Sequence, residues 1–140
     1  MGDRTRAMNR ELIGMCACEA VSFTVTDDFK YSANCHCSVC RRATGSAFKP
    51  FGGIEVGAIR LTSGSSNLMI VGGEIDHDVR CATCGSYLYS VVREGAFVHV
   101  SYGSLIDAPT LTPTEHIHVA SKAAWYSICD ELPQYAAFPE

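Results

Sequence analysis

The stretch Cys35-His36-Cys37-Ser38-Val39-Cys40 places three thiols within six residues, a spacing typical of metal ligands. Two shorter clusters flank this stretch, Cys16-Ala17-Cys18 before it and Cys81-Ala82-Thr83-Cys84 after it. Thiolates two or three residues apart can reach a single ion at a Zn–S distance of about 2.3 Å. The seven clustered cysteines therefore predict one closed four-ligand zinc site and one three-ligand site with an open position, where chemistry can occur.

The two outer pairs are expected to form the closed site. Cys16 and Cys18 precede a predicted strand, and residues i and i+2 of an extended chain point to the same face. Cys81 and Cys84 form a C-x-x-C turn followed by Gly85, which permits the left-handed backbone that turns N–H groups toward sulfur. Binding of structural zinc contributes about 10–16 kcal/mol in peptides. A zinc ion held by these four cysteines would therefore be part of folding.

The central cluster is expected to form the open site. Cys40 falls in the first turn of a short predicted helix, where the helix amides and the adjacent Arg41 and Arg42 favour thiolate over thiol. Three thiolates and one zinc carry a net charge of −1, which suits binding of a fourth thiolate better than activation of water. Cys35, Cys37 and Cys40 are therefore predicted to be catalytic residues as well as metal ligands, and the predicted substrate is a thiol.

Two other interpretations of the central cluster stay open at this stage. A histidine or Cys129 could complete it as a closed site, or Cys37 and Cys40 could form an oxidised redox pair. Cys129 belongs to none of the clusters and is expected to be a buried structural thiol.

The histidines carry a weaker signal than the cysteines. His36 lies between two ligands in extended chain and is expected to point away from them. His116 and His118 are two residues apart on a predicted strand, so they should share a face and either bind a metal or satisfy hydrogen bonds. The remaining histidines in predicted strands, His77 and His99, show no sign of a site.

Composition fits a single globular domain. The chain has 140 residues, of which 47% are hydrophobic and 19% charged. We predict a flexible tail over residues 1–10 and one zinc-binding domain over 11–140. The formal net charge of −4 disfavours nucleic acid as a partner. No apolar run or leader pattern predicts membrane insertion, so we expect a cytoplasmic protein whose thiols stay reduced. Oligomeric state is left open.

The hydrophobic pattern predicts many short strands and little helix. Val21, Phe23 and Val25 alternate with polar residues, as in a half-buried strand. Gly52-Gly53 and other glycine pairs are expected to punctuate the strands. The one expected helix covers Ser38–Thr44, with Ser38 as its N-cap and Gly45 past its end. Further strands are expected at Ile59–Thr62, Leu68–Val71, Glu74–Arg80, Tyr87–Val92, Ala96–Ser101 and His116–Val119.

These motifs resemble the glutathione-dependent formaldehyde-activating (GFA) family, which shares its domain with centromere protein V. The resemblance runs over residues 12–140. It rests on the segments Gly14–Cys18, Asn34–Phe48, Cys81–Ser86, His116–Lys122, Trp125-Tyr126 and Leu132–Tyr135. It implies a mainly β architecture, the β-tent fold, with antiparallel sheets organised around zinc. It also implies a structural zinc on Cys16, Cys18, Cys81 and Cys84, and a second, exchangeable zinc on Cys35, Cys37 and Cys40.

The resemblance further implies a carbon–sulfur lyase that joins glutathione and formaldehyde reversibly into S-hydroxymethylglutathione. In that reaction the second zinc would hold the glutathione sulfur against the aldehyde. The alternatives from other classes are a non-catalytic, zinc-stabilised thiol-binding module and a redox sensor that uses Cys35, Cys37 and Cys40.

Two positions depart from the family pattern. Glu19 stands where a glycine usually follows the first C-x-C, and Ala124 replaces the proline usual before the Trp-Tyr pair. Neither change removes a ligand. Arg41, Arg42 and Lys122 could meet glutathione carboxylates or be plain surface charges, and Trp125 and Tyr126 could wall a pocket or pack in the core.

Overall fold

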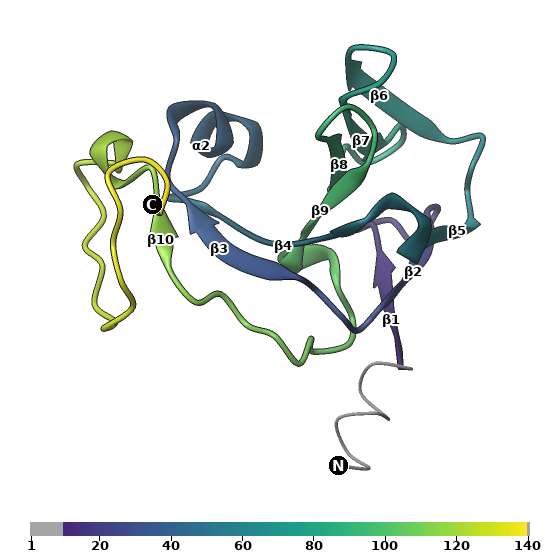
Figure 1. Cartoon of the computed structure of the whole chain (residues 1–140). Coiled ribbons are helices and arrows are strands. Elements are labelled where there is room, and N and C mark those ends of the chain that lie inside the picture. The colour runs from purple at the N-terminus through teal and green to yellow at the C-terminus, as the bar shows by residue number, and fades with distance from the viewer. Residues whose placement is uncertain (1–9, 140) are drawn as a thin grey trace.

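The computed structural model describes residues 10–139, and their strands form two sheets (Figure 1). The smaller sheet has the order β1 (Glu11–Met15), β2 (Ser22–Thr26) and β5 (Ile59–Ser63). The larger sheet has the order β10 (His116–Ile117), β3 (Tyr31–Cys35), β4 (Lys49–Glu55), β9 (Phe97–Ser101), β8 (Tyr87–Val92), β7 (His77–Cys81) and β6 (Leu68–Gly72). The predicted tail falls outside the described residues, apart from Arg10.

The helical content of residues 10–139 is small. It consists of the α-helix α2 (Ser38–Thr44) and three 3-10 turns, η1 (Val56–Ala58), η2 (Tyr102–Ser104) and η3 (Val119–Ser121). The predicted mainly β architecture is confirmed, with one difference: β10 pairs with β3 in parallel, while the other strand pairs are antiparallel. None of the helices in this part of the chain is long and apolar enough to cross a membrane.

The main core lies between the small sheet and the β8–β9 part of the large sheet. Phe23 of β2 is fully buried and meets the ring of Tyr89 edge-on, with 5.9 Å between ring centroids. Val98 and Val100 of β9 are buried in the same cluster. Burying an apolar side chain of this size contributes about 1.5–3 kcal/mol, so this cluster supplies the rigid base of the fold.

A second, smaller core supports the functional region. Ala33, Cys35, Phe51 and Ile117 are buried together, from β3, β4 and β10. Cys35 therefore enters the structure as a packed residue at the end of β3, which fixes the position of its sulfur.

Several predicted element boundaries are wrong for identifiable reasons. Strands β1, β3 and β4 were not expected, and Gly52-Gly53 lies inside β4, where a Cβ on Gly53 would come within 2.2 Å of the Tyr31 ring. Strand β7 begins at His77 because Gly73 donates to the Asp76 carbonyl at 2.9 Å and closes a turn. Strand β10 ends at Ile117 because His118 has a left-handed backbone with φ of 56°.

Helix α2 has the predicted bounds, but its cap differs. The N-cap is Cys37, not Ser38, and the Cys37 sulfur accepts the Cys40 N–H at 3.2 Å. Gly45 ends the helix with φ of 63°, and its N–H donates to the Arg41 carbonyl. A predicted metal ligand thus also caps the helix that carries another one.

Candidate metal centres and the adjoining cavity

The four outer cysteines lie together. The sulfurs of Cys16, Cys18, Cys81 and Cys84 all fall within 4.8 Å of one another. The Cys16–Cys18 and Cys18–Cys81 sulfur pairs are each separated by 3.7 Å. A tetrahedral ion with bonds of about 2.3 Å needs sulfurs about 3.8 Å apart. The arrangement therefore fits a tetrahedral metal such as zinc with little adjustment.

Hydrogen bonds to these sulfurs favour the thiolate form. Cys16 accepts the Val21 N–H at 3.2 Å, and Cys81 accepts the N–H groups of Thr83 and Cys84 at 3.3 and 3.4 Å. The Ser86 side chain lies 3.2 Å from the Cys84 sulfur and, with the backbone, lowers the Cys84 pKa to about 5. Donors aimed at a charged sulfur stabilise it. At Cys18 the Ala20 N–H acts in the same direction, but burial and the three neighbouring sulfurs outweigh it and raise the pKa to about 11. The hydrogen bonds therefore favour thiolate at Cys84 and Cys81, while Cys18 keeps its proton until a cation takes its place.

Glu19 keeps the backbone that the glycine usual at its position would provide. Its φ is 68°, in the left-handed region, and its N–H donates to the Cys16 carbonyl at 3.1 Å. Glutamate at this position therefore leaves the conformation of the turn unchanged. The left-handed backbone of Glu19 is strained, because it is unfavourable for residues other than glycine.

The three central cysteines also lie together, within 4.8 Å of one another. Cys35 comes from the end of β3, Cys37 is the N-cap of α2, and Cys40 lies in its first turn. A hydrogen bond from the Cys40 thiol lowers the pKa of Cys35 to about 6. Within residues 10–139 no other cysteine, histidine or carboxylate joins this cluster. The same hydrogen bond to Cys35 raises the pKa of Cys40, against the expectation that the helix amides and the adjacent arginines favour its thiolate. The cluster is a three-cysteine ligand set with room for a fourth ligand.

Cys129 does not complete that set. It is exposed, and its sulfur lies 3.6 Å from the Ser127 carbonyl oxygen. The prediction that Cys129 is a buried structural thiol is therefore wrong.

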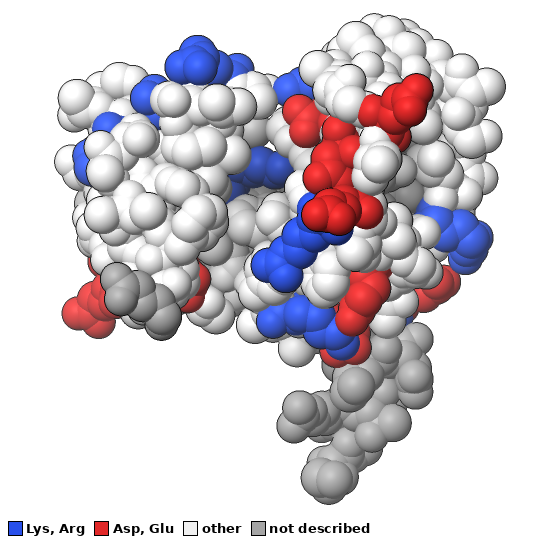
Figure 2. Space-filling view, turned by 45° about the horizontal axis from the view of Figure 1, so that its top comes forward, with Lys and Arg blue, Asp and Glu red and all other residues white. Residues whose placement is uncertain are grey.

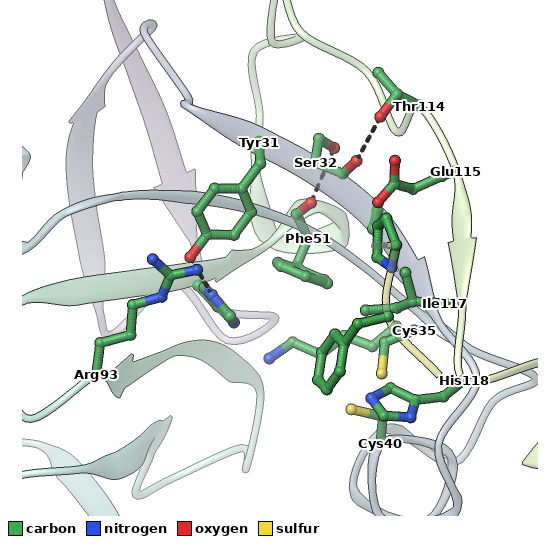
Figure 3. Close-up of a pocket in the computed structure, with 15 residues that line it drawn as sticks. Tyr31, Ser32, Cys35, Cys40, Phe51, Arg93, Thr114, Glu115, Ile117 and His118 are labelled. Atoms are coloured by element: carbon green, nitrogen blue, oxygen red, sulfur yellow. Dashed lines mark hydrogen bonds between the residues drawn. The ribbon is translucent and has the colours of Figure 1, made fainter. Parts of the chain in front are cut away.

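A cavity of about 420 Å³ opens beside the three-cysteine cluster (Figure 3). Cys35, Cys40 and His118 lie at one end of it, while Tyr31 and Arg93 lie at the other. Its volume is in the range of pockets that bind small molecules. A ligand placed there would have direct access to two of the three sulfurs.

The far end of the cavity is an aromatic and basic wall. The Tyr31 hydroxyl and His99 Nε2 are 2.7 Å apart, and the His99 ring stacks on Phe51 with centroids 4.4 Å apart. The Arg93 guanidinium lies over the Tyr31 ring at 4.9 Å. Burial lowers the pKa of His99 to about 4, so this imidazole is neutral near pH 7. Nothing in the sequence around His99 indicates a site, yet this residue lines the cavity.

Lys49 is a second basic group of the cavity, and it is almost fully buried, with 4% of its surface exposed. Its ammonium donates to the Tyr87 hydroxyl at 3.0 Å and to Ser90 Oγ at 3.4 Å. Both hydroxyls donate in turn to Asp78, at 3.0 and 2.8 Å. Burial lowers the Lys49 pKa, while the surrounding charges oppose this. The network holds a cation against the cavity wall.

The three basic residues that could have met carboxylates or been plain surface charges lie outside the cavity. Arg41 donates to the Ser121 carbonyl at 3.1 Å, and Lys122 donates to the Ala123 carbonyl at 3.0 Å. Neither these two nor Arg42 lines the cavity. Figure 2 shows basic side chains on the outer surface of both halves of the molecule and others in the hollow between them. Lys49 and Arg93 are the basic residues that line the cavity itself.

Neither of the two aromatic residues that could have walled a pocket or packed in the core lines the cavity. Trp125 is 73% exposed and does not line the cavity. Tyr126 packs against Phe48, with ring centroids 5.5 Å apart, and does not line the cavity either. Phe51 and Phe138 line the cavity in their place.

The histidines near the cluster separate into two roles. His36 points away from the sulfurs, as expected, and its Nε2 lies 2.8 Å from His116 Nδ1. His116 Nε2 in turn lies 3.0 Å from the Asp130 carboxylate. His118 turns instead toward the cavity and meets the Phe138 ring edge-on at 4.5 Å. The prediction that His116 and His118 share a strand face is therefore wrong.

Comparison with known proteins supports a relationship over most of the chain. A family model described as "Glutathione-dependent formaldehyde-activating enzyme" matches residues 11–121. A crystal structure of a Rhodobacter sphaeroides protein, solved as a structural genomics target, is similar with a TM-score of 0.57 and 26% sequence identity. That match covers 70% of this chain and 91% of the other. Comparison with curated proteins gives no significant match.

Proposed function

Because the chain belongs to the glutathione-dependent formaldehyde-activating enzyme family, we propose that it is a zinc-dependent carbon–sulfur lyase acting on a thiol adduct. The proposed substrates are glutathione and formaldehyde, which combine to S-hydroxymethylglutathione. One observation carries the proposal: two of three clustered thiols line a cavity, and no fourth ligand from residues 10–139 closes the cluster.

The proposed reaction forms one bond and opens another. The thiol sulfur bonds to the aldehyde carbon, the C=O double bond becomes a single bond, and the thiol proton ends on the new hydroxyl oxygen. Zinc held by Cys35, Cys37 and Cys40 would bind the substrate sulfur as a thiolate beside the aldehyde. The cavity wall supplies the rest of the site.

Lys49 and Arg93 are the proposed binding residues for an anionic thiol. Both line the cavity that Cys35 and Cys40 border, and Glu115 is the acidic residue among the lining residues of the described chain. A charge-assisted hydrogen bond to a carboxylate is about twice as strong as a neutral one. The two cations therefore favour glutathione over an uncharged thiol of similar size.

Tyr31 and His99 are proposed to shape the end of the cavity rather than to transfer protons. Their mutual hydrogen bond occupies the Tyr31 hydroxyl and His99 Nε2, and Phe51 covers the His99 ring. A rigid aromatic wall excludes water and orients a bound ligand.

The four outer cysteines are proposed to hold a structural zinc. This site joins the residues before β2 to the turn after β7. Two of its ligands, Cys18 and Cys81, are 63 positions apart in the sequence. We also propose a cytoplasmic location, because thiolate ligands in both clusters need a compartment that keeps them reduced.

The test is enzyme-dependent formation of S-hydroxymethylglutathione, measured by exchange NMR against a protein-free blank, because formaldehyde adds to thiols unaided. Cys40→Ser should reduce the rate to the blank. Cys129→Ser, which changes an exposed cysteine outside both clusters, should leave it unchanged. Full activity in Cys40→Ser would contradict the proposal.

A redox sensor is the second candidate, and the close approach of the three central thiols favours it. It requires that mild oxidation with peroxide converts two of these thiols to a disulfide, with peroxide reduced to water. Zinc release on oxidation, reversed by a thiol reductant, together with no lyase activity, would support the sensor over the enzyme.

A further inference from the structure

Three polar side chains form a continuous hydrogen-bonded chain behind the central cysteines. His36 and His116 are both 0% exposed, and Asp130 is at the surface. His36 Nε2 lies 2.8 Å from His116 Nδ1, and His116 Nε2 lies 3.1 and 3.0 Å from the two Asp130 oxygens. This chain leads from the surface to the residue between two predicted metal ligands.

The carboxylate sets the direction of these hydrogen bonds. An ionised Asp130 can only accept, so His116 Nε2 carries the hydrogen, and in the neutral imidazole His116 Nδ1 is then the acceptor. His36 must then donate through Nε2. Its own Nδ1 is buried and has no hydrogen-bond partner. A single carboxylate at the surface thus fixes the tautomer and orientation of both rings.

Other contacts would not fix the orientation of the His36 ring. Phe48 and Tyr126 lie against His36 with tilted rings, at 4.9 and 6.4 Å between centroids. A half-turn of the imidazole about its Cβ–Cγ bond keeps the ring in the same plane, so these contacts do not decide which ring atom faces His116. The hydrogen bond to His116 is the directional contact on the His36 side chain, since Nδ1 makes none.

The same region joins the cysteine loop to the cavity wall through the backbone. His36 N–H donates to the Ile117 carbonyl at 2.9 Å, and His116 N–H donates to the Pro133 carbonyl at 2.8 Å. The segment after Asp130 continues alongside β10 and reaches Phe138, which packs on His118 and lines the cavity. Figure 1 shows this segment beside β10 at the end of the large sheet.

We propose that Asp130, His116 and His36 are positioning residues that hold the loop carrying Cys35, Cys37 and Cys40 in the geometry that retains the second metal. The inference rests on the proposed function, in that the second cluster must bind a metal. Groups one step removed from metal ligands commonly change metal affinity by about 10- to 100-fold when they are removed. Here Asp130, His116 and His36 would affect metal affinity in this way without contacting the metal or the substrate.

The test follows release of zinc from the fully loaded protein to a coloured chelator, in the unchanged chain and in Asp130→Ala. Asp130 is exposed, so its loss is not expected to unfold the core. One of the two zinc ions should be removed about 10-fold more readily, and the other should be unaffected. Asp130→Asn retains an acceptor for His116, so its rate of zinc release should lie between those of the unchanged chain and Asp130→Ala.

Asp76→Ala is the matched control. Asp76 is likewise exposed and accepts two backbone N–H groups, from Glu94 and Gly95 at 3.2 and 2.9 Å, but it belongs to neither cysteine cluster. Its zinc release should equal that of the unchanged chain. Equal release from Asp130→Ala, or loss of both zinc ions together, would overturn the inference.

A separate measurement distinguishes this inference from the proposed function. If the unchanged chain binds a single zinc ion, the proposed function fails. The positioning role is then measured by hydrogen exchange of the backbone amides of residues 37–41 without metal. Faster exchange in Asp130→Ala than in Asp76→Ala supports the role, and equal exchange overturns it.

Discussion

Cys35 and Lys49 are directly opposite each other in the antiparallel pair of β3 and β4. Opposed residues of two antiparallel strands place their side chains on the same face of the sheet. A predicted metal ligand and a buried ammonium therefore line one cavity. Their separation in sequence hides this relationship. The pairing places Lys49 and Cys35 on the wall of the same cavity.

Replacing Lys49 with methionine should lower kcat/KM for glutathione about 10-fold or more, because the anionic substrate loses a charge-assisted partner. The loss should be smaller for cysteamine, a thiol without a carboxylate. Lys49→Arg, which keeps the charge, should be less impaired than Lys49→Met. The control is Lys30→Met, which removes a surface lysine paired with Asp28. Equal losses for both thiols would contradict a role in binding the carboxylate.

Replacing Glu19 with glycine should raise the free energy of unfolding by about 1 kcal/mol, because glycine adopts a φ of 68° without strain. The same substitution at Glu11, in extended strand β1, should lower it by about 0.5–1 kcal/mol. Denaturant unfolding of the metal-loaded proteins measures both. A lower free energy of unfolding in Glu19→Gly would show that the Glu19 side chain stabilises the fold by more than its strained backbone destabilises it.

Replacing Gly53 with alanine should displace the Tyr31 ring, since the added Cβ would lie 2.2 Å from it. Overpacking of this kind costs about 1–3 kcal/mol, and the bond between Tyr31 and His99 should weaken. Gly57→Ala is the control, because no atom lies within 4 Å of its added Cβ. The thermal unfolding temperature and KM for glutathione should change in Gly53→Ala and stay nearly constant in Gly57→Ala.

His99 should make the fold less stable in mild acid. Its pKa is about 4 in the folded protein and about 6.5 when unfolded. Between these values the unfolded chain binds the extra proton, so stability is fully present above pH 6.5 and declines as the pH falls toward 4.

His99→Phe should therefore lose less stability between pH 7.5 and 5 than the unchanged chain. Acid effects on the metal sites are common to both proteins and cancel in the comparison. His77→Gln, at the start of β7, should keep the slope of the unchanged chain. Parallel slopes for His99→Phe and the unchanged chain would rule out this role.

The cysteine clusters and helix α2 could be predicted because their signals are local. Ligands two or three residues apart are read directly from the chain, and the helix from Ser38 to Thr44 is bounded by a cap and by Gly45. Most strands with alternating side chains were also predicted. The spacing alone did not show that Cys37 would serve as the helix cap.

The cavity could not be predicted, because its residues come together only through strand pairing. Lys49, Arg93 and His99 lie in or beside strands β4, β8 and β9, and nothing in their local sequence distinguishes them. Strands β3 and β4 were missed for a related reason. Gly52 and Gly53 indicate a turn, yet they occupy the middle of a strand because the aromatic side chains of Phe29, Tyr31 and Tyr102 fill the space above them.

The most direct test of the account is the number of zinc ions per chain, in protein purified under reductant without chelator. The account predicts two in the unchanged chain and one in Cys37→Ser, with the folded structure retained. It predicts loss of folding together with zinc in Cys84→Ser. One zinc ion in the unchanged chain, or an unchanged count in Cys37→Ser, would contradict the proposal that the second cluster is an open metal site.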